Sequence, residues 1–295
     1  MEFATEGNGS PETRREEFRE RVRKDWDNAQ TIAAWRKWSR TRTETFAGIT
    51  RALVEAATAS PGQAILDIAS GAGQPALSLA AAVGPKGTVT ATDQSAGMLE
   101  VAQENAQLAG LANLRFRRAD AESLPFPDRT FDRVTCRLGA MFFSDPVGAM
   151  KECLRVLLPR GRAAFVVWGG PQQPFFAMTA GVLRRFVPFP EPEQGAPHVF
   201  RYAAPGTLSD VLRDAGFSAV EEEQLRIVCE RIGTPEEFWE EFREVAAPFR
   251  PLIEGLPPEL RAQLDGEVLA AMQQYSTGDR MQFHVEVNLA RGMRP

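Results

Sequence analysis

Histidine and cysteine are scarce in this chain of 295 residues. It has two histidines, His198 and His284, and three cysteines, Cys136, Cys153 and Cys229. The cysteines are unevenly spaced within apolar stretches, so the sequence offers neither a disulfide framework nor a Cys-x-x-Cys metal pair. Two histidines far apart in the sequence supply too few ligands for a zinc site. The sequence therefore predicts no metal centre.

The chain also lacks long apolar runs and a surplus of basic residues. No run approaches the ~18 apolar residues that a membrane-spanning helix needs, and residues 1–11 are polar where an export signal would be apolar. The formal net charge of -5 provides no basic field for a nucleic-acid backbone. We expect a cytoplasmic protein with a small-molecule partner and no nucleic-acid partner; a monomer and a homodimer remain equally open.

What the chain does contain is an alternation of short β-type runs and amphipathic helices. The pattern predicts strands near 64–69, 87–92, 113–117, 131–136 and 162–168. Ser95 is placed to cap a helix that ends at Gly110, and Asp145 followed by Pro146 begins another. Such alternation is typical of a parallel sheet wound by right-handed crossovers. Two further strands are expected near 219–229 and 281–290.

Composition divides the chain into five segments. They are a disordered start at 1–11, N-terminal helices at 12–60 that cover the site, a cofactor-binding core at 61–168, a lid or substrate insertion at 169–206 rich in proline and phenylalanine, and a C-terminal half of the core at 207–295 with a helical insertion at 234–274. Thr207 and Thr234 are each followed three residues later by an acid, Asp210 and Glu237. This spacing predicts that each threonine caps a helix.

The first strand leads into a glycine loop. The run Ala64 to Ala76 turns through Gly71 and Gly73 into a helix, where bare backbone lets a ligand approach closely. A nucleotide-like cofactor is the natural occupant, but Gly71-x-Gly73-x-x-Ala76 also satisfies the dinucleotide fingerprint of nicotinamide enzymes. A purely structural turn is the third alternative. Asp93, about 20 residues further on, can accept hydrogen bonds from both hydroxyls of a ribose, which either cofactor class would use.

The chain lacks the catalytic parts of a nicotinamide-dependent oxidoreductase. Its two tyrosines, Tyr202 and Tyr275, are followed four residues later by Gly206 and Asp279, so no Tyr-x-x-x-Lys pair exists. Zinc ligands are missing as well. This reading is therefore disfavoured, although the glycine loop alone permits it.

Three motifs resemble class I S-adenosylmethionine-dependent methyltransferases, in particular the quinone-ring C-methyltransferases and their small-molecule relatives. They are the runs 66–77, 92–99 and 120–132, which contain Leu-Asp-Ile-Ala-Ser-Gly-Ala-Gly, Thr-Asp-Gln-Ser and Asp-Ala-Glu-Ser-Leu-Pro-Phe. The resemblance covers about 60–168 and continues weakly into 207–220. It implies a doubly wound, Rossmann-like α/β sheet of seven mostly parallel strands, the last antiparallel, with N-terminal helices and lid insertions.

The same resemblance implies S-adenosylmethionine as cofactor and assigns it nine residues: Asp67, Ala69, Gly71, Gly73, Asp93, Gln94, Met98, Asp120 and Ala121. In this assignment Asp67 organises the loop near the methionine portion, Asp93 holds the ribose, and Asp120 bonds the adenine amine. The family often has glycine at the positions of Ala69 and Pro75. A binding protein that keeps the cofactor site without catalysis is therefore a further alternative.

Candidates outside the motifs are fewer. Trp38, with its neighbour Trp35, either covers the cofactor or packs between helices. Arg137, at the end of the fourth strand, contacts substrate or the cofactor carboxylate, or forms a salt bridge. His198, in the lid, is a possible general base or a packing histidine. The lid phenylalanines favour an apolar or aromatic methyl acceptor, whose methylated atom, C, N, O or S, the sequence leaves open.

Overall fold

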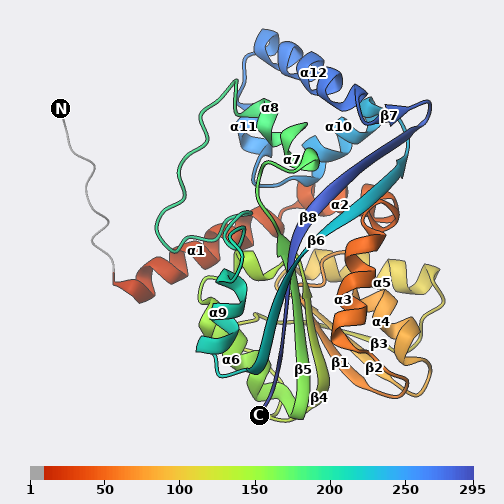
Figure 1. Ribbon diagram of the computed structural model, residues 1–295, viewed down its shortest axis with the longest axis vertical. Coiled ribbons are helices and arrows are strands. Elements are labelled where there is room, and N and C mark those ends of the chain that lie inside the picture. The colour runs from red at the N-terminus through yellow and green to blue at the C-terminus, as the bar shows by residue number, and fades with distance from the viewer. Residues whose placement is uncertain (1–9) are drawn as a thin grey trace.

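The computed structural model describes residues 10–295, which form an eight-stranded sheet flanked by helices (Figure 1). The strands are β1 Ala64–Ile68, β2 Thr88–Asp93, β3 Leu114–Arg118, β4 Phe131–Arg137, β5 Leu157–Trp168, β6 Ser218–Ile232, β7 Ser276–Thr277 and β8 Arg280–Met293. Their order is β3-β2-β1-β4-β5-β8-β6, with β7 paired to β8. Because β8 runs antiparallel to β5 and β6, the predicted sheet with an antiparallel last strand is confirmed. The two-residue β7 was missed, since it is too short to show an alternating pattern.

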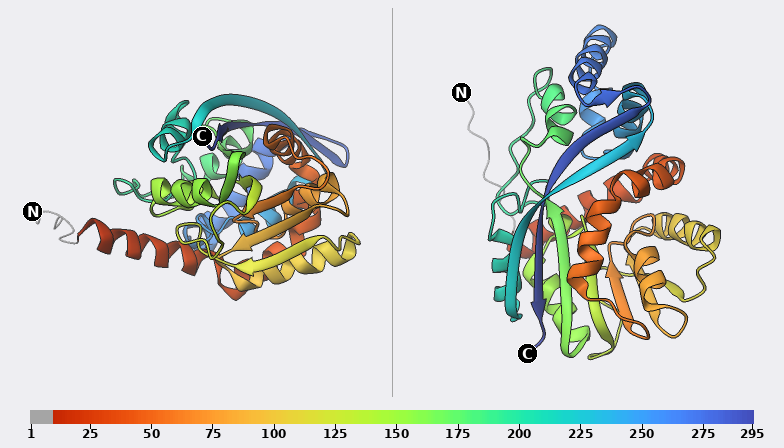
Figure 2. Two further views of the ribbon diagram at one scale, coloured as in Figure 1. Left: turned by 90° about the horizontal axis from the view of Figure 1, so that it is seen from below. Right: turned by 45° about the vertical axis from the view of Figure 1, so that its right-hand side comes forward.

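Helices cover both faces of this sheet. They are α1 Pro11–Trp26, α2 Ala29–Thr45, α3 Ala47–Ala57, α4 Ala76–Val83, α5 Ala96–Leu108, the 3₁₀ turn η1 Ala140–Phe142, α6 Pro146–Val156, α7 Pro174–Ala177, α8 Ala180–Leu183, α9 Thr207–Asp214, α10 Pro235–Val245, α11 Arg250–Glu254 and α12 Pro258–Gln273. Helices α3, α4 and α5 lie to one side of the strands and α6 and α9 to the other, while α1 projects away from the body (Figures 1 and 2). The arrangement is the doubly wound one that the alternating pattern predicts.

Three of the predicted helix caps are present. Ser95 accepts a hydrogen bond from the amide of Met98, and Asp145 accepts one from Gly148. Thr234 and Glu237 form a complete capping box at the start of α10. Each cap satisfies an amide that has no partner within its own helix.

The predicted cap at Thr207 is wrong. Thr207 is the first residue of α9, and its hydroxyl donates to the carbonyl of Ala204. The carboxylate of Glu222, on β6, accepts hydrogen bonds from the amides of Gly206 and Ser209 instead. A tertiary contact has therefore replaced the local cap, which sequence spacing alone cannot reveal.

The sheet continues beyond its central strands. The upper halves of β6 and β8, from about 225 to 232 and 280 to 287, pair with each other and reach the group formed by α10, α11 and α12 (Figures 1 and 2). Against this extension packs an aromatic cluster that includes Phe175, Phe238 and Phe283. The predicted insertions at 169–206 and 234–274 thus lie above one end of the sheet.

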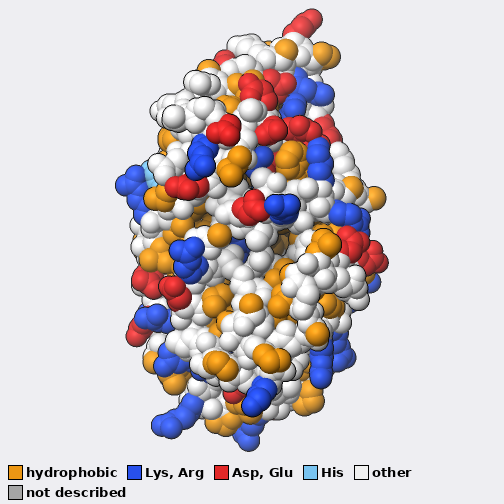
Figure 3. Space-filling model, turned by 90° about the vertical axis from the view of Figure 1, so that its right-hand side faces the viewer, with side chains coloured by type: hydrophobic (Ala, Val, Ile, Leu, Met, Phe, Trp, Pro, Cys, Tyr) orange, Lys and Arg blue, Asp and Glu red, His pale blue; other side chains and the backbone are white. Residues whose placement is uncertain are grey.

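At the N-terminus, residues 1–9 of the predicted disordered start lie outside the described residues. Ser10 accepts a hydrogen bond from the amide of Thr13, and α1 begins at Pro11. Among residues 10–295, no helix combines the length and the apolar character that crossing a membrane requires. Basic and acidic side chains are interspersed over the face shown in Figure 3, in keeping with the small net charge.

Candidate functional site

A cavity opens where the parallel strands β1, β2, β4 and β5 end. This is the edge of a doubly wound sheet at which ligands usually bind. Most of its lining comes from two groups of residues. One group lies in the loops that follow β1, β2 and β3, and the other consists of aromatic rings at the end of β5, in α7, in α10 and in the segment before α11; residues of α1, α2 and the segment after β4 complete the lining. We call these the loop half and the aromatic half of the cavity.

The glycine loop forms the floor of the loop half. Ala69, Gly71 and Gly73 all have positive φ angles, of 54°, 51° and 113°. The backbone conformation explains why glycine suits these positions, since residues with a Cβ rarely adopt it. A Cβ placed on Gly71 would meet no atom within 4 Å, so open space reaches the backbone there. At Gly73 a Cβ would lie 2.3 Å from Leu77, and this glycine serves packing under the loop.

Asp93 ends β2 and closes the other side of the loop. Its two carboxylate oxygens accept hydrogen bonds from the amides of Gly71 and Ser95, each 2.9 Å long. Burial raises the pKa of Asp93, and the two amides act against that rise. Because each oxygen has a second lone pair, the carboxylate can still accept hydrogen bonds from two hydroxyl groups on the cavity side.

Asp67 lies directly beneath the loop and is fully buried. The hydroxyl of Thr135 donates to its Oδ1 atom at 2.7 Å, whereas Oδ2 has no partner among the described residues. Burial raises the pKa of Asp67 to about 7. Asp67 does not line the cavity, so it is not placed to contact a ligand directly.

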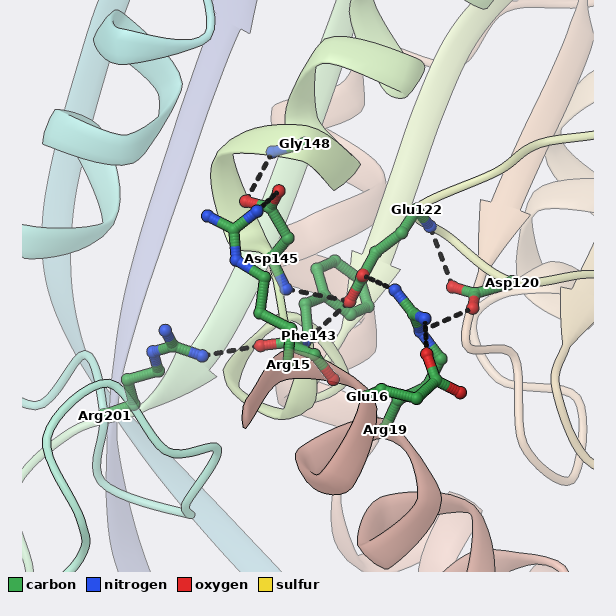
Figure 4. Close-up of polar contacts among 10 residues, drawn as sticks. Arg15, Glu16, Arg19, Asp120, Glu122, Phe143, Asp145, Gly148 and Arg201 are labelled. Carbon is green, nitrogen blue, oxygen red and sulfur yellow. Dashed lines mark hydrogen bonds and ion pairs between the residues drawn. The ribbon is translucent and has the colours of Figure 1, made fainter. Parts of the chain in front are cut away.

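Asp120 and Ala121, after β3, complete the loop half together with Gln94 and Met98. The amide of Glu122 donates to Asp120 at 2.9 Å. Arg19, on α1, lies 3.3 Å from the other Asp120 oxygen and donates to Glu122 at 2.6 Å (Figure 4). This arginine therefore fixes both acids from a helix about 100 residues away in the sequence.

Helix α1 is held over the cavity by further ion pairs. Arg15 donates to the Asp145 carboxylate at 2.7 Å. The backbone amide of the same Asp145 donates to Glu122 (Figure 4). Helix α1 also makes an apolar contact there: Trp26 packs edge-on against Phe142, with ring centres 5.5 Å apart. The exposed ion pairs contribute modestly and weaken with salt. The predicted covering role of the N-terminal helices stays a prediction, and the contacts of α1 support it.

The aromatic half is built from side chains of four separate elements. Its rings are Trp168, Phe175, Phe176, Phe242 and Phe249. Phe175 stacks on Trp168 at 5.4 Å and lies edge-on to Phe242 at 5.9 Å. Such contacts fix the ring planes before any ligand arrives. This wall favours a flat, apolar molecule.

Arg137, the last residue of β4, lies between the two halves. It lines the cavity, and its buried Nε atom has no hydrogen-bond partner among residues 10–295. Burial lowers the pKa of Arg137 to about 10, with nearby Arg42 acting in the same direction. The side chain is therefore still positively charged at neutral pH. The predicted contact with substrate or cofactor stays a prediction, and Arg137 forms no ion pair with any of residues 10–295.

Two other predicted residues lie outside the cavity lining. Trp38 donates its indole N–H to Glu244 at 2.5 Å and contacts Lys37, whereas Trp35 lines the cavity. His198 accepts a hydrogen bond from the amide of Phe200 at 3.3 Å, and burial lowers its pKa. Neither side chain reaches the space between the two halves, so their assigned roles gain no support here.

Sequence reasoning missed Arg19 and Arg42. Arg19 belongs to a charged helix whose many arginines look alike, and nothing in the sequence separates it from them. Arg42 lies one helical turn after Trp38 and two turns after Trp35. Its guanidinium lies over the Trp35 ring at 4.8 Å. That spacing was a usable signal. No group of three or more His, Cys, Asp or Glu side chains among residues 10–295 is arranged to hold a metal ion.

Comparison with known proteins adds independent findings. Residues 66–165 match a family model described as a methyltransferase domain. The chain is 37% identical over 123 residues to the ubiquinone/menaquinone biosynthesis C-methyltransferase UbiE of Shewanella sediminis (strain HAW-EB3). The matched stretch covers 41% of this chain and 49% of that protein. It is 44% identical over 110 residues to the uncharacterized methyltransferase YcgJ of Bacillus subtilis (strain 168), covering 37% and 42%. The chain thus spans about half the length, or less, of these relatives.

Solved structures share the fold. The crystal structure of YcgJ from Bacillus subtilis superposes with a TM-score of 0.54 at 23% identity, over 83% of this chain and 97% of that one. The [4+2]-cyclase SpnF gives a TM-score of 0.51 at 22% identity, over 84% and 80%. SpnF is named for a different reaction on a similar fold, so the shared fold alone does not determine the activity.

Proposed function

We propose that this chain, whose residues 66–165 match a methyltransferase domain, uses S-adenosylmethionine to transfer a methyl group to a small apolar or aromatic acceptor. One observation carries the proposal. A single cavity joins Gly71, Asp93 and Asp120, the three motif positions that can hold the cofactor, to a wall of aromatic rings. The two reactants of a methyl transfer therefore have adjoining places.

The residues of the loop half fit S-adenosylmethionine. Open space reaches the Gly71 backbone, and the Asp93 carboxylate faces the same cavity with lone pairs free for a ribose. Met98 and Ala121 offer apolar surface for a purine, beside the Asp120 carboxylate. These residues would hold the cofactor.

When bound, S-adenosylmethionine supplies a methyl group on a sulfonium, which a nucleophilic acceptor atom takes by in-line displacement. The chain's contribution is chiefly positioning, since well-oriented reactants can lower a barrier by roughly 7 to 11 kcal/mol. The aromatic half offers a flat surface that can set the plane of the acceptor, and the ion pairs of Arg19 with Asp120 and Glu122 lie beside the loop half. His198, the predicted general base, does not line the cavity, so this proposal assigns no general base.

A ring carbon of a quinone-like compound is the finer form of this proposal. The name of the UbiE relatives, quinone-biosynthetic C-methyltransferases, supports it, as does the flat aromatic wall. The family model matches residues 66–165, which build the loop half. The acceptor wall, from 168 to 176 and 242 to 249, lies outside that match. The ring-carbon acceptor therefore rests on likeness in the cofactor domain.

Two measurements test the proposal. Calorimetry with S-adenosylmethionine, S-adenosylhomocysteine and NAD should show binding of the first two and none of NAD. The transfer of labelled methyl groups should then be screened over quinols, phenols, amines and thiols. Tighter binding of NAD, or no binding of S-adenosylhomocysteine, refutes the assignment. Cofactor binding without transfer to any acceptor would instead favour a binding protein that lacks catalysis.

A further inference from the structure

The charged residues that line the cavity differ in whether the protein itself supplies each of them with a partner. They are Arg19, Arg42, Asp93, Asp120, Glu122 and Arg137. Five of the six are engaged within the protein by hydrogen bonds or ion pairs, as described above for the acids and Arg19 and as Arg42 is by Glu241 at 2.9 Å. No hydrogen bond or ion pair connects the Arg137 guanidinium to any other residue between 10 and 295. Arg137 is the one charged group of the lining left without a partner in this part of the chain.

The surroundings of Arg137 also carry a surplus of positive charge. Its electrostatic neighbours are Arg42, Asp67 and the Cys229 thiol. Arg42 shares the carboxylate of Glu241 with the buried Arg231. Three guanidinium groups therefore stand against two carboxyls, and burial raises the pKa of Asp67 to about 7, so its charge is incomplete at neutral pH.

Such a surplus is unfavourable in the free protein. Arg137 is half-buried, and only its Nε atom is buried without a hydrogen-bond partner; Asp67 attracts its charge, but no carboxylate forms an ion pair with it among residues 10–295. A partly dehydrated cation of this kind gains from a hydrogen-bonded anion. Arginine offers a planar fork of donors that matches the two oxygens of a carboxylate. Binding of an anion at Arg137 would satisfy the donors and reduce the surplus at once. The position of Arg137 then determines which molecule brings that anion.

Arg137 ends β4, whose neighbours in the sheet are β1, which leads into the glycine loop, and β5, which ends at Trp168. It thus lies where the loop half meets the aromatic half. S-adenosylmethionine would bring a sulfonium and an ammonium along with its carboxylate, so the bound cofactor leaves the surplus of positive charge in place. An anionic acceptor removes it.

We propose that Arg137 binds the carboxylate of an aromatic acceptor whose ring lies against Trp168, Phe175 and Phe176. The acceptor class is then aromatic acids, in place of the neutral quinone-like ring named above, and Arg137 determines specificity by positioning them. This inference rests on the proposed function, because it assigns the aromatic half of the cavity to the methyl acceptor. A carboxylate from the cofactor's own methionine portion is the competing source of the same anion.

The test is a binding experiment on the full chain saturated with S-adenosylhomocysteine. Benzoate, cinnamate and 2-naphthoate are each titrated against the matching primary amide, by calorimetry and by quenching of tryptophan fluorescence. We expect at least one acid to bind 10-fold or more tightly than its amide. Arg137→Gln should reduce that preference to less than 3-fold, Arg137→Lys should keep part of it, and the exposed control Arg184→Gln should leave it unchanged.

The variants also separate the two sources of the anion. Affinity for S-adenosylhomocysteine should change less than 3-fold in Arg137→Gln. If it falls 10-fold or more while the preference for acids persists, Arg137 serves the cofactor and the proposal is overturned. Failure of every acid to bind better than its amide also overturns it. If wild type binds no S-adenosylhomocysteine, the proposed function fails, and the same titrations without it still decide whether Arg137 selects acids.

Discussion

The two halves of the cavity are built in different ways. The loop half consists of backbone and short acids at consecutive strand ends, and all of its parts lie within about 55 residues of sequence, from Ala69 to Glu122. The aromatic half takes its rings from β5, α7, α10 and the segment before α11, which are spread over about 80 residues. The loop half also coincides with the methyltransferase family match, whereas the aromatic half lies almost entirely beyond it.

This difference has an energetic side. In the loop half, the polar groups that face the ligand, the Gly71 backbone and the carboxylates of Asp93 and Asp120, are not part of the hydrophobic core, whereas Met98 and Ala121 beside them are buried. In the aromatic half, the wall of the cavity is also part of the core, because Phe175 contacts six other aromatic rings. Acceptor specificity and stability are therefore coupled there.

The strongest test of that coupling is Phe175→Ala. Phe175 is only 4% exposed, and removing a buried ring costs about 3–5 kcal/mol. We expect the free energy of unfolding in urea to fall by this amount. Leu108→Ala, which removes an apolar side chain that is 87% exposed, should change it by less than ~0.5 kcal/mol. A loss below ~1 kcal/mol in Phe175→Ala would show that wall and core are separate.

Asp93→Ala should give the opposite behaviour. We expect affinity for S-adenosylhomocysteine to fall at least ~100-fold, about 2.7 kcal/mol, because the carboxylate that faces the ribose is lost. The fold should persist, since only two loop amides lose their acceptor. Calorimetry gives the affinity, and circular dichroism checks the fold. Asp93→Asn, which keeps one oxygen acceptor, should fall between; an unchanged affinity in both variants would refute the ribose role.

The buried Asp67, which lies beneath the loop half, predicts that the free energy of unfolding depends on pH. Its folded pKa of about 7 lies above the unfolded value of 3.8, so between pH 4 and 7 the folded chain holds a proton that the unfolded chain has lost. Stability therefore decreases as pH rises through that window. Relative to Asp67→Asn, we expect wild type to lose roughly 2–3 kcal/mol in urea unfolding between pH 5 and 8, because one bound proton is worth about 1.4 kcal/mol per pH unit up to the folded pKa.

A control variant isolates this effect from the rest of the chain's titration. Asp214 is exposed and has no ion pair among the described residues, so Asp214→Asn should follow the wild-type pH curve. If Asp67→Asn follows it too, Asp67 ionises as an ordinary carboxyl and its burial has no thermodynamic consequence.

The smallest expected effect concerns the glycine loop itself. Ala69 adopts a positive φ of 54°, which costs an L-residue about 1–2 kcal/mol. Glycine relieves this strain but adds unfolded-state entropy of about 0.4–1 kcal/mol. Ala69→Gly should therefore raise the free energy of unfolding by less than ~1 kcal/mol and leave cofactor affinity within 3-fold. Ala72→Gly, in the same loop without a positive φ, should lower it by ~0.5–1 kcal/mol; equal signs for the two variants would contradict the strain.

The sequence predicted most of the fold and the loop half of the site. Strand positions, the antiparallel last strand and the caps at Ser95, Asp145 and Thr234 follow from local patterns and motif resemblance, and the structure has them. Of the nine residues assigned to the cofactor, seven line the cavity and two, Asp67 and Gly73, lie just beneath it. Strand ends meet at one edge of a parallel sheet, so a linear pattern is enough to bring them together.

Only the tertiary structure decided the rest. Glu222 caps α9 in place of Thr207, Arg19 fixes Asp120 from α1, and Trp35 faces the cavity where Trp38 does not. Each of these outcomes depends on the angle at which one element packs on another, which no local spacing encodes. Arg137 shows the same division. Its place at the end of β4 was readable in the sequence, whereas its lack of a partner depends on where Arg42, Asp67 and Glu241 come to lie in the folded chain.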